Sequence, residues 1–99
     1  LLPVSSTAAF AHAPVSPNRP PPLLLVDDQP TPYFMATIAH CSLLSLSGSP
    51  VVSLPAGRSV DGLPIGVQLV GRKWHDEALL EVAAVIDAVL PGFVAPPAY

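Results

Sequence analysis

The chain has 99 residues and a formal net charge of −3, and 51% of it is hydrophobic while only 11% is charged, against about 25% charged in an ordinary soluble domain. Four basic side chains are too few to neutralise many phosphates, which excludes a nucleic-acid binder driven by a basic patch. The hydrophobic content excludes a disordered tail. A single cysteine excludes a disulfide framework and a cysteine-rich zinc site. Because the charge is so low, we interpret the chain as a piece of a larger globular protein.

The beginning of the chain predicts a short strand without a leader. Residues 1–4 form an apolar run, LLPV, that starts with leucine rather than methionine. A signal peptide would need a basic start and a longer apolar stretch, so we expect that the sequence was cut or processed upstream. The absence of a signal peptide from these residues favours a cytoplasmic protein, unless a leader was lost with an upstream part. Residues 29–57 carry no charge but contain prolines and serines, which favours a buried helix and strand over a membrane span.

Prolines dominate residues 11–32. Pro14, Pro17 and residues 20–22 cannot continue a helix or a central strand. We therefore predict a loop over the whole of 11–32, with polyproline stiffness around residues 20–22. A loop of this length usually lines a site or wraps a surface. A proline-rich ligand for an aromatic groove is the alternative.

A helix is predicted from Tyr33 to about Leu44, because its apolar residues recur at the helical period. Thr31 is expected to cap this helix and Pro32 to occupy its first position. Apolar residues on most of its sides predict that the helix is buried. The serine- and glycine-rich residues 45–49 are expected to end it.

Two strands joined by an exposed loop predict a β-hairpin. Residues 51–54 are rich in β-branched side chains and uncharged, as in a short buried strand, which residues 55–57 should end. Residues 65–70 alternate apolar with small or polar side chains, as a strand does. Gly66 in this second strand predicts a bulge or close packing against its neighbour.

A last helix is predicted over residues 76–90. Asp76 is expected to cap it, and Glu77 lies in its first turn, where the helix dipole favours an anion. Pro91 should end it. The predicted core stripe consists of Leu79, Val82, Ala83, Ile86, Val89 and Leu90.

The chemically reactive side chains do not form an active site by themselves. Ser47 and Ser49 flank a glycine between a helix and a strand, whereas a nucleophile elbow has a strand before its serine and a glycine on each side. Cys41 follows His40 directly, and adjacent residues on a helix point in different directions, so inert packing is expected. Lys73, the single lysine, is interpreted as a solvated loop residue.

Neither a metal nor a cofactor is expected. His12, His40 and His75 are too far apart in sequence to match a compact metal motif. The chain also contains no glycine-rich phosphate loop, so a nucleotide cofactor has no support.

Three stretches together resemble the C-terminal block of the amidase signature family. They are SLSGSPVVSLPAG at 45–57, DGLPIGVQLVG at 61–71 and DEALL at 76–80. These stretches are similar to the family pattern TGxPAvSvPAG, GLPvGvQlvG and DExLL. LLPV at 1–4 and AFAH at 9–12 are similar to the strand and the AFPH stretch that precede that block. The resemblance therefore covers nearly the whole chain.

The resemblance implies an α/β fold, in which the chain is a fragment of a mixed-sheet α/β/α sandwich. Residues 1–99 would be the C-terminal part of a single amidase domain. Its parts would be a strand, the long proline-rich loop (11–32), a helix, the β-hairpin motif (45–71) and the C-terminal helix (76–90).

The activity implied is hydrolysis of carboxylic amide C–N bonds by a Ser–Ser–Lys triad, in which a lysine and a bridging serine activate the nucleophile. Those residues belong to the family's N-terminal half, so no catalytic residue is carried over and the chain alone is expected to be inactive. The implied partners are the N-terminal catalytic part of the same chain and a small amide substrate, with no nucleic acid, membrane, metal or cofactor. A homodimer of the full protein stays open.

The resemblance also implies three candidate pocket walls. In the family, the helix before the hairpin and the junction at residues 45–48 lie near the acyl pocket, which makes Cys41, Ser45 and Ser47 candidates; ordinary packing is the alternative. The chain departs from the family at Ser45, where asparagine is usual, and at Ala11 and Ala13, where proline and aspartate are frequent.

Two other functions stay open. One is a free-standing, non-catalytic structural or interaction module, which the proline-rich loop suggests. The other is the C-terminal part of the amidase subunit of a tRNA-dependent amidotransferase, which would need an ammonia source and partner subunits. Residues 71–80, which include Trp74, look closer to general amidases.

Overall fold

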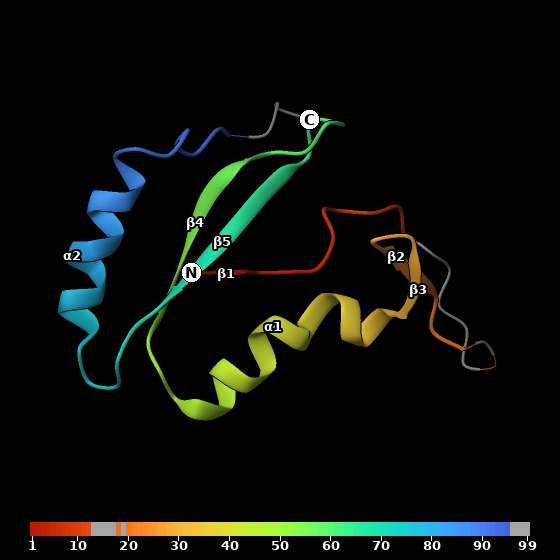
Figure 1. Cartoon of the computed structure of the whole chain (residues 1–99), viewed down its shortest axis with the longest axis horizontal. Coiled ribbons are helices and arrows are strands. Elements are labelled where there is room, and N and C mark those ends of the chain that lie inside the picture. The colour runs from red at the N-terminus through yellow and green to blue at the C-terminus, as the bar shows by residue number, and fades with distance from the viewer. Residues whose placement is uncertain (13–17, 19, 96–99) are drawn as a thin grey trace.

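The computed structural model describes residues 1–12, 18 and 20–95, and these fold into two antiparallel sheets and two helices. A three-stranded sheet has the order β1-β5-β4, and a two-stranded sheet pairs β2 with β3. Figure 1 shows the β4–β5 hairpin between α2 on one side and α1 on the other. This arrangement confirms the predicted α/β class. In chain order the elements are β1 (Leu2–Pro3), β2 (Leu23–Val26), β3 (Gln29–Pro32), α1 (Tyr33–Ser47), β4 (Val51–Arg58), β5 (Pro64–Val70) and α2 (Asp76–Asp87).

The predicted β-hairpin is confirmed, but its strands are longer than expected. β4 continues through the residues that were expected to end it, as far as Arg58. The register shifts between Pro55 and Gly57, so that a β-bulge absorbs one residue there. Pro55 has no backbone N–H to donate to the neighbouring strand, and the bulge interrupts the regular hydrogen-bond pattern at this point. Gly66 lies opposite Pro55, so the bulge expected at Gly66 belongs to the facing strand.

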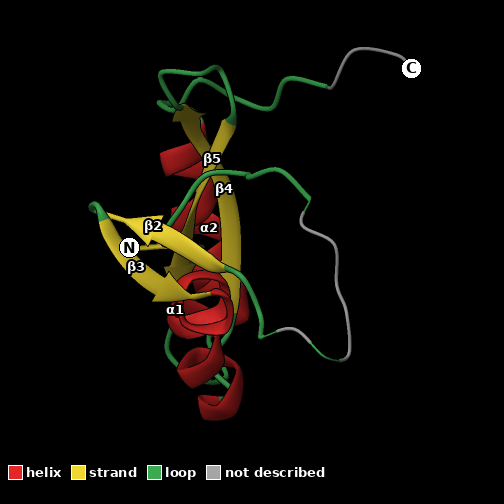
Figure 2. Ribbon diagram, turned by 90° about the vertical axis from the view of Figure 1, so that its right-hand side faces the viewer, coloured by secondary structure: helices red, strands yellow, loops and turns green. Residues whose placement is uncertain are grey.

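The prediction of a loop over all of 11–32 is wrong for residues 23–32, which form a β-hairpin. β2 and β3 pair in register from Leu23↔Pro32 to Val26↔Gln29, around Asp27 and Asp28 at φ of 48° and 61°. Positive φ at both central residues is typical of a type I′ hairpin turn, and aspartate tolerates it better than most residues. The prolines of β3 are accommodated because both strands of a two-stranded sheet are edge strands. Figure 2 shows this small sheet beside α1 and separate from the β4–β5 hairpin; Pro14 and Pro17 lie outside the described residues.

α1 begins where predicted but is not capped by Thr31. Thr31 lies in β3 and its hydroxyl donates to the Gln29 carbonyl at 3.1 Å, while Pro32 is the N-cap and makes no side-chain cap bond. The helix runs through Ser47, three residues further than predicted, because the left-handed residue that ends it is Gly48 at φ 66°.

The predicted burial of α1 is also wrong for this chain. Within the helix only Ala36 is buried, whereas Phe34, Leu43 and Leu46 are 64%, 75% and 85% exposed. A helix that is apolar on most sides and still open to solvent has uncovered apolar faces.

α2 packs on β4 and β5 and begins at Asp76 as predicted, but its cap and its C-terminal end differ from the prediction. His75 rather than Asp76 is the N-cap, without a side-chain cap bond, and the helix ends at Asp87. Leu79 and Ala83 are buried as predicted. Val82 is half exposed and Val89 is 82% exposed, so the sheet covers only part of the predicted stripe.

The described residues hold a very small core. The buried apolar side chains among them are Ala36, Leu54, Leu79 and Ala83. The radius of gyration is 15.8 Å, against about 13 Å for a compact domain of about 100 residues. The elements therefore spread out instead of closing around one core.

Candidate functional site

A polar joint connects the first strand, α1 and β5. Its centre is Gln68, which is 3% exposed and donates through Nε2 to the carbonyls of Pro3 at 2.8 Å and His40 at 3.1 Å. Buried polar groups are costly unless they are paired, so these two bonds fix the crossing of three elements. We call this group of contacts the β1–α1 joint.

The segment after β1 extends the joint along α1. The Ser6 amide donates to the Ala36 carbonyl at 3.0 Å, and Ser5 Oγ donates to the same carbonyl at 3.3 Å. Ser6 Oγ lies 3.1 Å from His40 Nε2. The chain thus holds a serine hydroxyl against a histidine ring, a pair that sequence analysis missed because no local pattern connects two residues so far apart.

The Ser6–His40 pair has the geometry of a hydroxyl and a general base but not the surroundings. A nucleophilic serine also needs a group that orients the histidine and donors that stabilise an oxyanion. Among the described residues, no carboxylate hydrogen-bonds to the His40 ring. We therefore interpret the pair as part of the joint.

Cys41 belongs to the same joint. Its thiol donates to the Val4 carbonyl at 3.2 Å, and the side chain is half-buried. This bond ties the segment after β1 to α1 at Cys41.

Ser45 and Ser47 lie further along α1 and are exposed. Ser47 Oγ donates to the Leu44 carbonyl at 2.7 Å, accepts from the Ser49 amide at 3.2 Å and lies 3.0 Å from Ser49 Oγ. Cys41 and Ser45 are one helical turn apart and share a face, whereas Ser47 closes the C-terminal turn. The structure therefore places the three candidates along one half of α1 without bringing them into one cluster.

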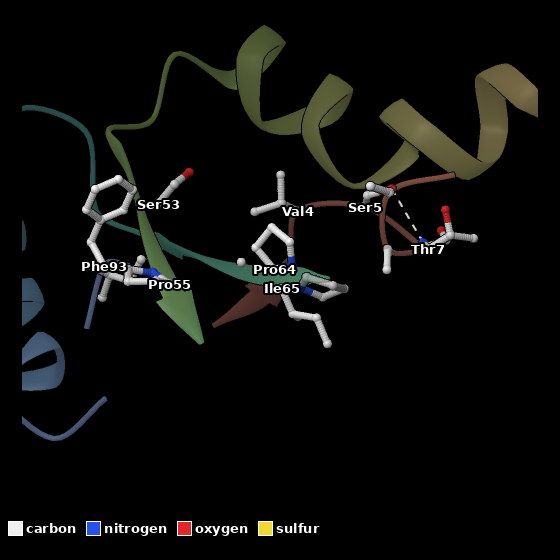
Figure 3. Close-up of a pocket in the computed structure, with 14 residues that line it drawn as sticks. Val4, Ser5, Thr7, Ser53, Pro55, Pro64, Ile65 and Phe93 are labelled. Carbon is white, nitrogen blue, oxygen red and sulfur yellow. Dashed lines mark hydrogen bonds between the residues drawn. The ribbon is translucent and has the colours of Figure 1, made fainter. Parts of the chain in front are cut away.

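The groove nearest the joint is lined by other residues. It has a volume of about 630 Å³ and is lined by residues 3–9, 53–55, 64–66 and Phe93. Figure 3 shows Phe93, Ser53 and Pro55 on one side of it and Ser5 and Thr7 on the other. Thr7 Oγ1 is buried there and has no hydrogen-bond partner among the described residues. None of the three candidate pocket walls lines this groove.

We also searched the described residues for clusters of metal ligands and for membrane-spanning helices. Over residues 1–12, 18 and 20–95, no three His, Cys, Asp or Glu side chains gather as a metal site would require. His12, His40 and His75 do not come together. Neither described helix has the length and apolar character of a membrane span.

The decisive observation is a comparison of the sequence with protein families. A family model described as Amidase matches residues 1–80. The chain belongs to the amidase family. The suggested resemblance is thereby confirmed, and the matched range includes the joint, the β4–β5 hairpin and the start of α2.

Curated amidase-family relatives match between 48% and 98% of the chain. The chain is 33% identical over 97 residues to a glutamyl-tRNA(Gln) amidotransferase subunit of Methylocella silvestris, a match that covers 98% of the chain. It is 39% identical over 75 residues to the subunit of the same name from Halobacterium salinarum, covering 76% of the chain. It is 49% identical over 47 residues, or 48% of the chain, to the 6-aminohexanoate-cyclic-dimer hydrolase of Paenarthrobacter ureafaciens. No solved structure matches the chain significantly.

These relatives are much longer than the chain. The match covers 17% of the Methylocella and Halobacterium subunits and 10% of the Paenarthrobacter hydrolase. The chain thus spans less than a fifth of the length of each of these relatives.

Proposed function

We propose that residues 1–99 form the C-terminal part of a single amidase domain, and that the complete domain hydrolyses carboxylic amide C–N bonds. The observation that carries the proposal is the Amidase match over residues 1–80. In this interpretation the Ser–Ser–Lys triad lies upstream and contributes the chemistry. The present residues contribute a sheet edge and two helices, so no residue of this chain is assigned a catalytic role.

The small core supports this division of labour. With Leu54 and Leu79 among the few buried apolar side chains, and Leu43 and Leu46 mostly exposed, the described residues bury much less apolar surface than an independent domain of this length. An upstream amidase part would cover these faces. The implied partners are therefore that N-terminal catalytic part and a small amide substrate.

Cys41, Ser45 and Ser47 remain the proposed pocket walls. The support is that Cys41 and Ser45 share a face of α1 and that Ser45 is exposed, so the hydroxyl is free to face a substrate brought by the upstream part. Ser47, which is engaged in the C-terminal turn, would shape the pocket through backbone geometry rather than direct contact.

The proposal is tested with a chimaera. The chain replaces a segment of equal length in the Paenarthrobacter 6-aminohexanoate-cyclic-dimer hydrolase, positioned by the 47 residues that align, and hydrolysis of the cyclic dimer is measured beside the isolated chain. We expect an active chimaera and an inactive chain. A folded but inactive chimaera, or hydrolysis of a simple aryl amide by the chain alone, would contradict the proposal.

The pocket walls are tested in the same chimaera. Ser45→Val is expected to change KM more than kcat, because a wall residue contacts bound substrate without taking part in bond cleavage. Ser59→Val, at a half-buried hydroxyl that accepts from the Leu63 amide in the loop after β4, is the control away from α1 and should leave KM unchanged. An unchanged KM for Ser45→Val would leave ordinary packing as its role.

An amidotransferase subunit is the second candidate function. It is favoured by relatives of that name that match 98% of the chain, whereas the hydrolase is more similar over a shorter stretch. Transfer of ammonia to misacylated tRNA by the complete protein together with partner subunits would favour it. Amide hydrolysis by the complete protein without partners would favour the amidase.

A non-catalytic module is the competing interpretation, whereas the cytoplasmic location and a homodimer belong to the proposal, and each of the three calls for a separate measurement. An intact native mass near 10 kDa and a cooperative thermal transition would support the module and oppose the amidase. Cell fractionation tests the location. Analytical ultracentrifugation of the complete protein tests the homodimer.

A further inference from the structure

α2 carries a second apolar stripe that the sheet leaves open. Leu79 and Ala83 face the sheet and are buried, while Val82 and Val85 are 50% and 70% exposed. This second stripe consists of Ala78, Val82, Val85 and, in the turn after the helix, Val89. Successive members are four, three and four residues apart, which keeps them on one side of the helix.

The edge of this stripe that lies away from the sheet is acidic. Glu77 and Glu81 are one turn apart, are exposed and flank the stripe. α2 also begins at Asp76 and ends at Asp87, and it contains no basic residue. The surface is therefore a narrow apolar seam with small or β-branched side chains and an uncompensated negative flank.

We propose that this stripe is the seat of a helix from the remaining amidase polypeptide, with a small apolar seam and a lysine or arginine opposite Glu77 and Glu81. The proposal rests on the proposed function, because it assumes that the chain continues an amidase that lies outside these residues. Relatives of which the chain covers only 17% have ample length to supply such a helix.

The small side chains of the stripe and its acidic flank limit which kind of segment can pack on it. Alanine and valine along the seam let a neighbouring helix approach to about 8–10 Å between axes, running along α2 on the same side of the sheet. The negative flank favours a cationic neighbour, since opposite charges across an interface select the partner and like charges oppose it. A second copy of α2 would bring four more acids and no cation, so a homodimer through this stripe is disfavoured.

Cysteine accessibility in the active chimaera tests the seat. Val85→Cys is placed in the stripe and Leu80→Cys, 59% exposed in the chain, lies on another side of α2 as the control. In the isolated chain both should react with a maleimide at similar rates. In the chimaera we expect the reaction of Val85→Cys to slow by about tenfold or more through burial, and Leu80→Cys to keep its rate. An active chimaera in which both react equally would overturn this inference and leave the amidase proposal standing.

A peptide probe keeps the inference falsifiable if the chimaera does not fold. Two helical peptides share an alanine–leucine seam and differ only in a lysine or a glutamate flank, and their binding to the chain is measured by fluorescence anisotropy. The lysine peptide should bind about tenfold more tightly, and the Glu77→Lys/Glu81→Lys variant should reverse the preference. Equal binding of both peptides, or self-association of the chain that Val85→Asn abolishes, would overturn the inference.

Discussion

The side chain of Lys73, from the segment between β5 and α2, lies against Gly48 at the end of α1. A Cβ built at residue 48 would be 3.2 Å from Lys73 Cε and 3.7 Å from Nζ. α1 has no basic residue in its own last turn. Lys73 therefore supplies from a distant segment the cation that the negative end of the helix dipole favours, and it joins α1 to the loop that leads into α2.

Gly48→Ala should destabilise the chain for two separate reasons. The left-handed conformation at φ 66° costs about 1 kcal/mol for a residue with a Cβ, and the new methyl group would crowd the Lys73 stem. We expect the free energy of unfolding in urea to fall by about 2 kcal/mol. Gly62→Ala is the matched control, because Gly62 has a φ of 78° and a Cβ built there would meet nothing within 4 Å. This variant should therefore lose only the part of the stability that comes from the backbone conformation. Equal losses at the two positions would show that the Lys73 contact contributes nothing.

Lys73→Met should separate the charge of the lysine from its packing. Methionine keeps an apolar stem over Gly48 but removes the ammonium group, so we expect a loss of about 0.5 kcal/mol at low salt. The loss should shrink in high salt because an exposed charge is screened. Lys73→Arg retains the cation and should match the parent chain at both salt concentrations. A loss for Lys73→Met that does not depend on salt would place the effect in packing alone.

Gly71→Ala tests how closely α2 approaches the end of β5. A Cβ at Gly71 would lie 3.0–3.2 Å from three atoms of the buried Leu79 side chain. Because overpacking forces shifts in neighbouring groups, we expect a loss of about 1–3 kcal/mol in the free energy of unfolding. Gly66→Ala, whose Cβ would make ordinary contacts at 3.6 Å with Leu54 and Val4, should change stability by less than about 0.5 kcal/mol. If Gly71→Ala were as mild as Gly66→Ala, the packing of α2 on the sheet would be looser than described.

Local pattern in the sequence predicted the elements that carry their own signal. β-branched, uncharged content predicted β4, alternation of apolar with small or polar side chains predicted β5, and helical periodicity predicted both helices. The β2–β3 hairpin was missed because prolines argue against strands, and because Asp27 and Asp28 form a tight turn without the glycine that usually marks one.

Contacts between distant segments lay beyond such patterns. Nothing local to Ser6 or His40 indicates that they meet, and nothing local to Lys73 indicates Gly48. The identification of the family came from resemblance across three stretches rather than from any single residue. The candidate walls Cys41, Ser45 and Ser47 came from the same resemblance and remain a proposal, since their role depends on a substrate and an upstream part.

Gln68→Leu should open the β1–α1 joint. Leucine has a similar volume but cannot donate, so the Pro3 carbonyl loses its 2.8 Å bond and the His40 carbonyl its 3.1 Å bond. A partly buried carbonyl that loses its hydrogen bond costs about 1–3 kcal/mol, and we expect the free energy of unfolding to fall by about 2 kcal/mol. Gln29→Leu, at an exposed position in β3, is the matched control and should stay within about 0.5 kcal/mol of the parent.

Hydrogen exchange distinguishes opening of the joint from general loosening. The Ser6 amide donates across the joint to Ala36, whereas the amide of Gly71 donates to Pro50 at the far end of the β4–β5 hairpin. In Gln68→Leu we expect protection of the Ser6 amide to fall much more than that of Gly71, because local opening exposes only the groups near the lost bonds. Equal losses of protection at both amides would mean that Gln68 supports the whole fold rather than the joint in which it is buried.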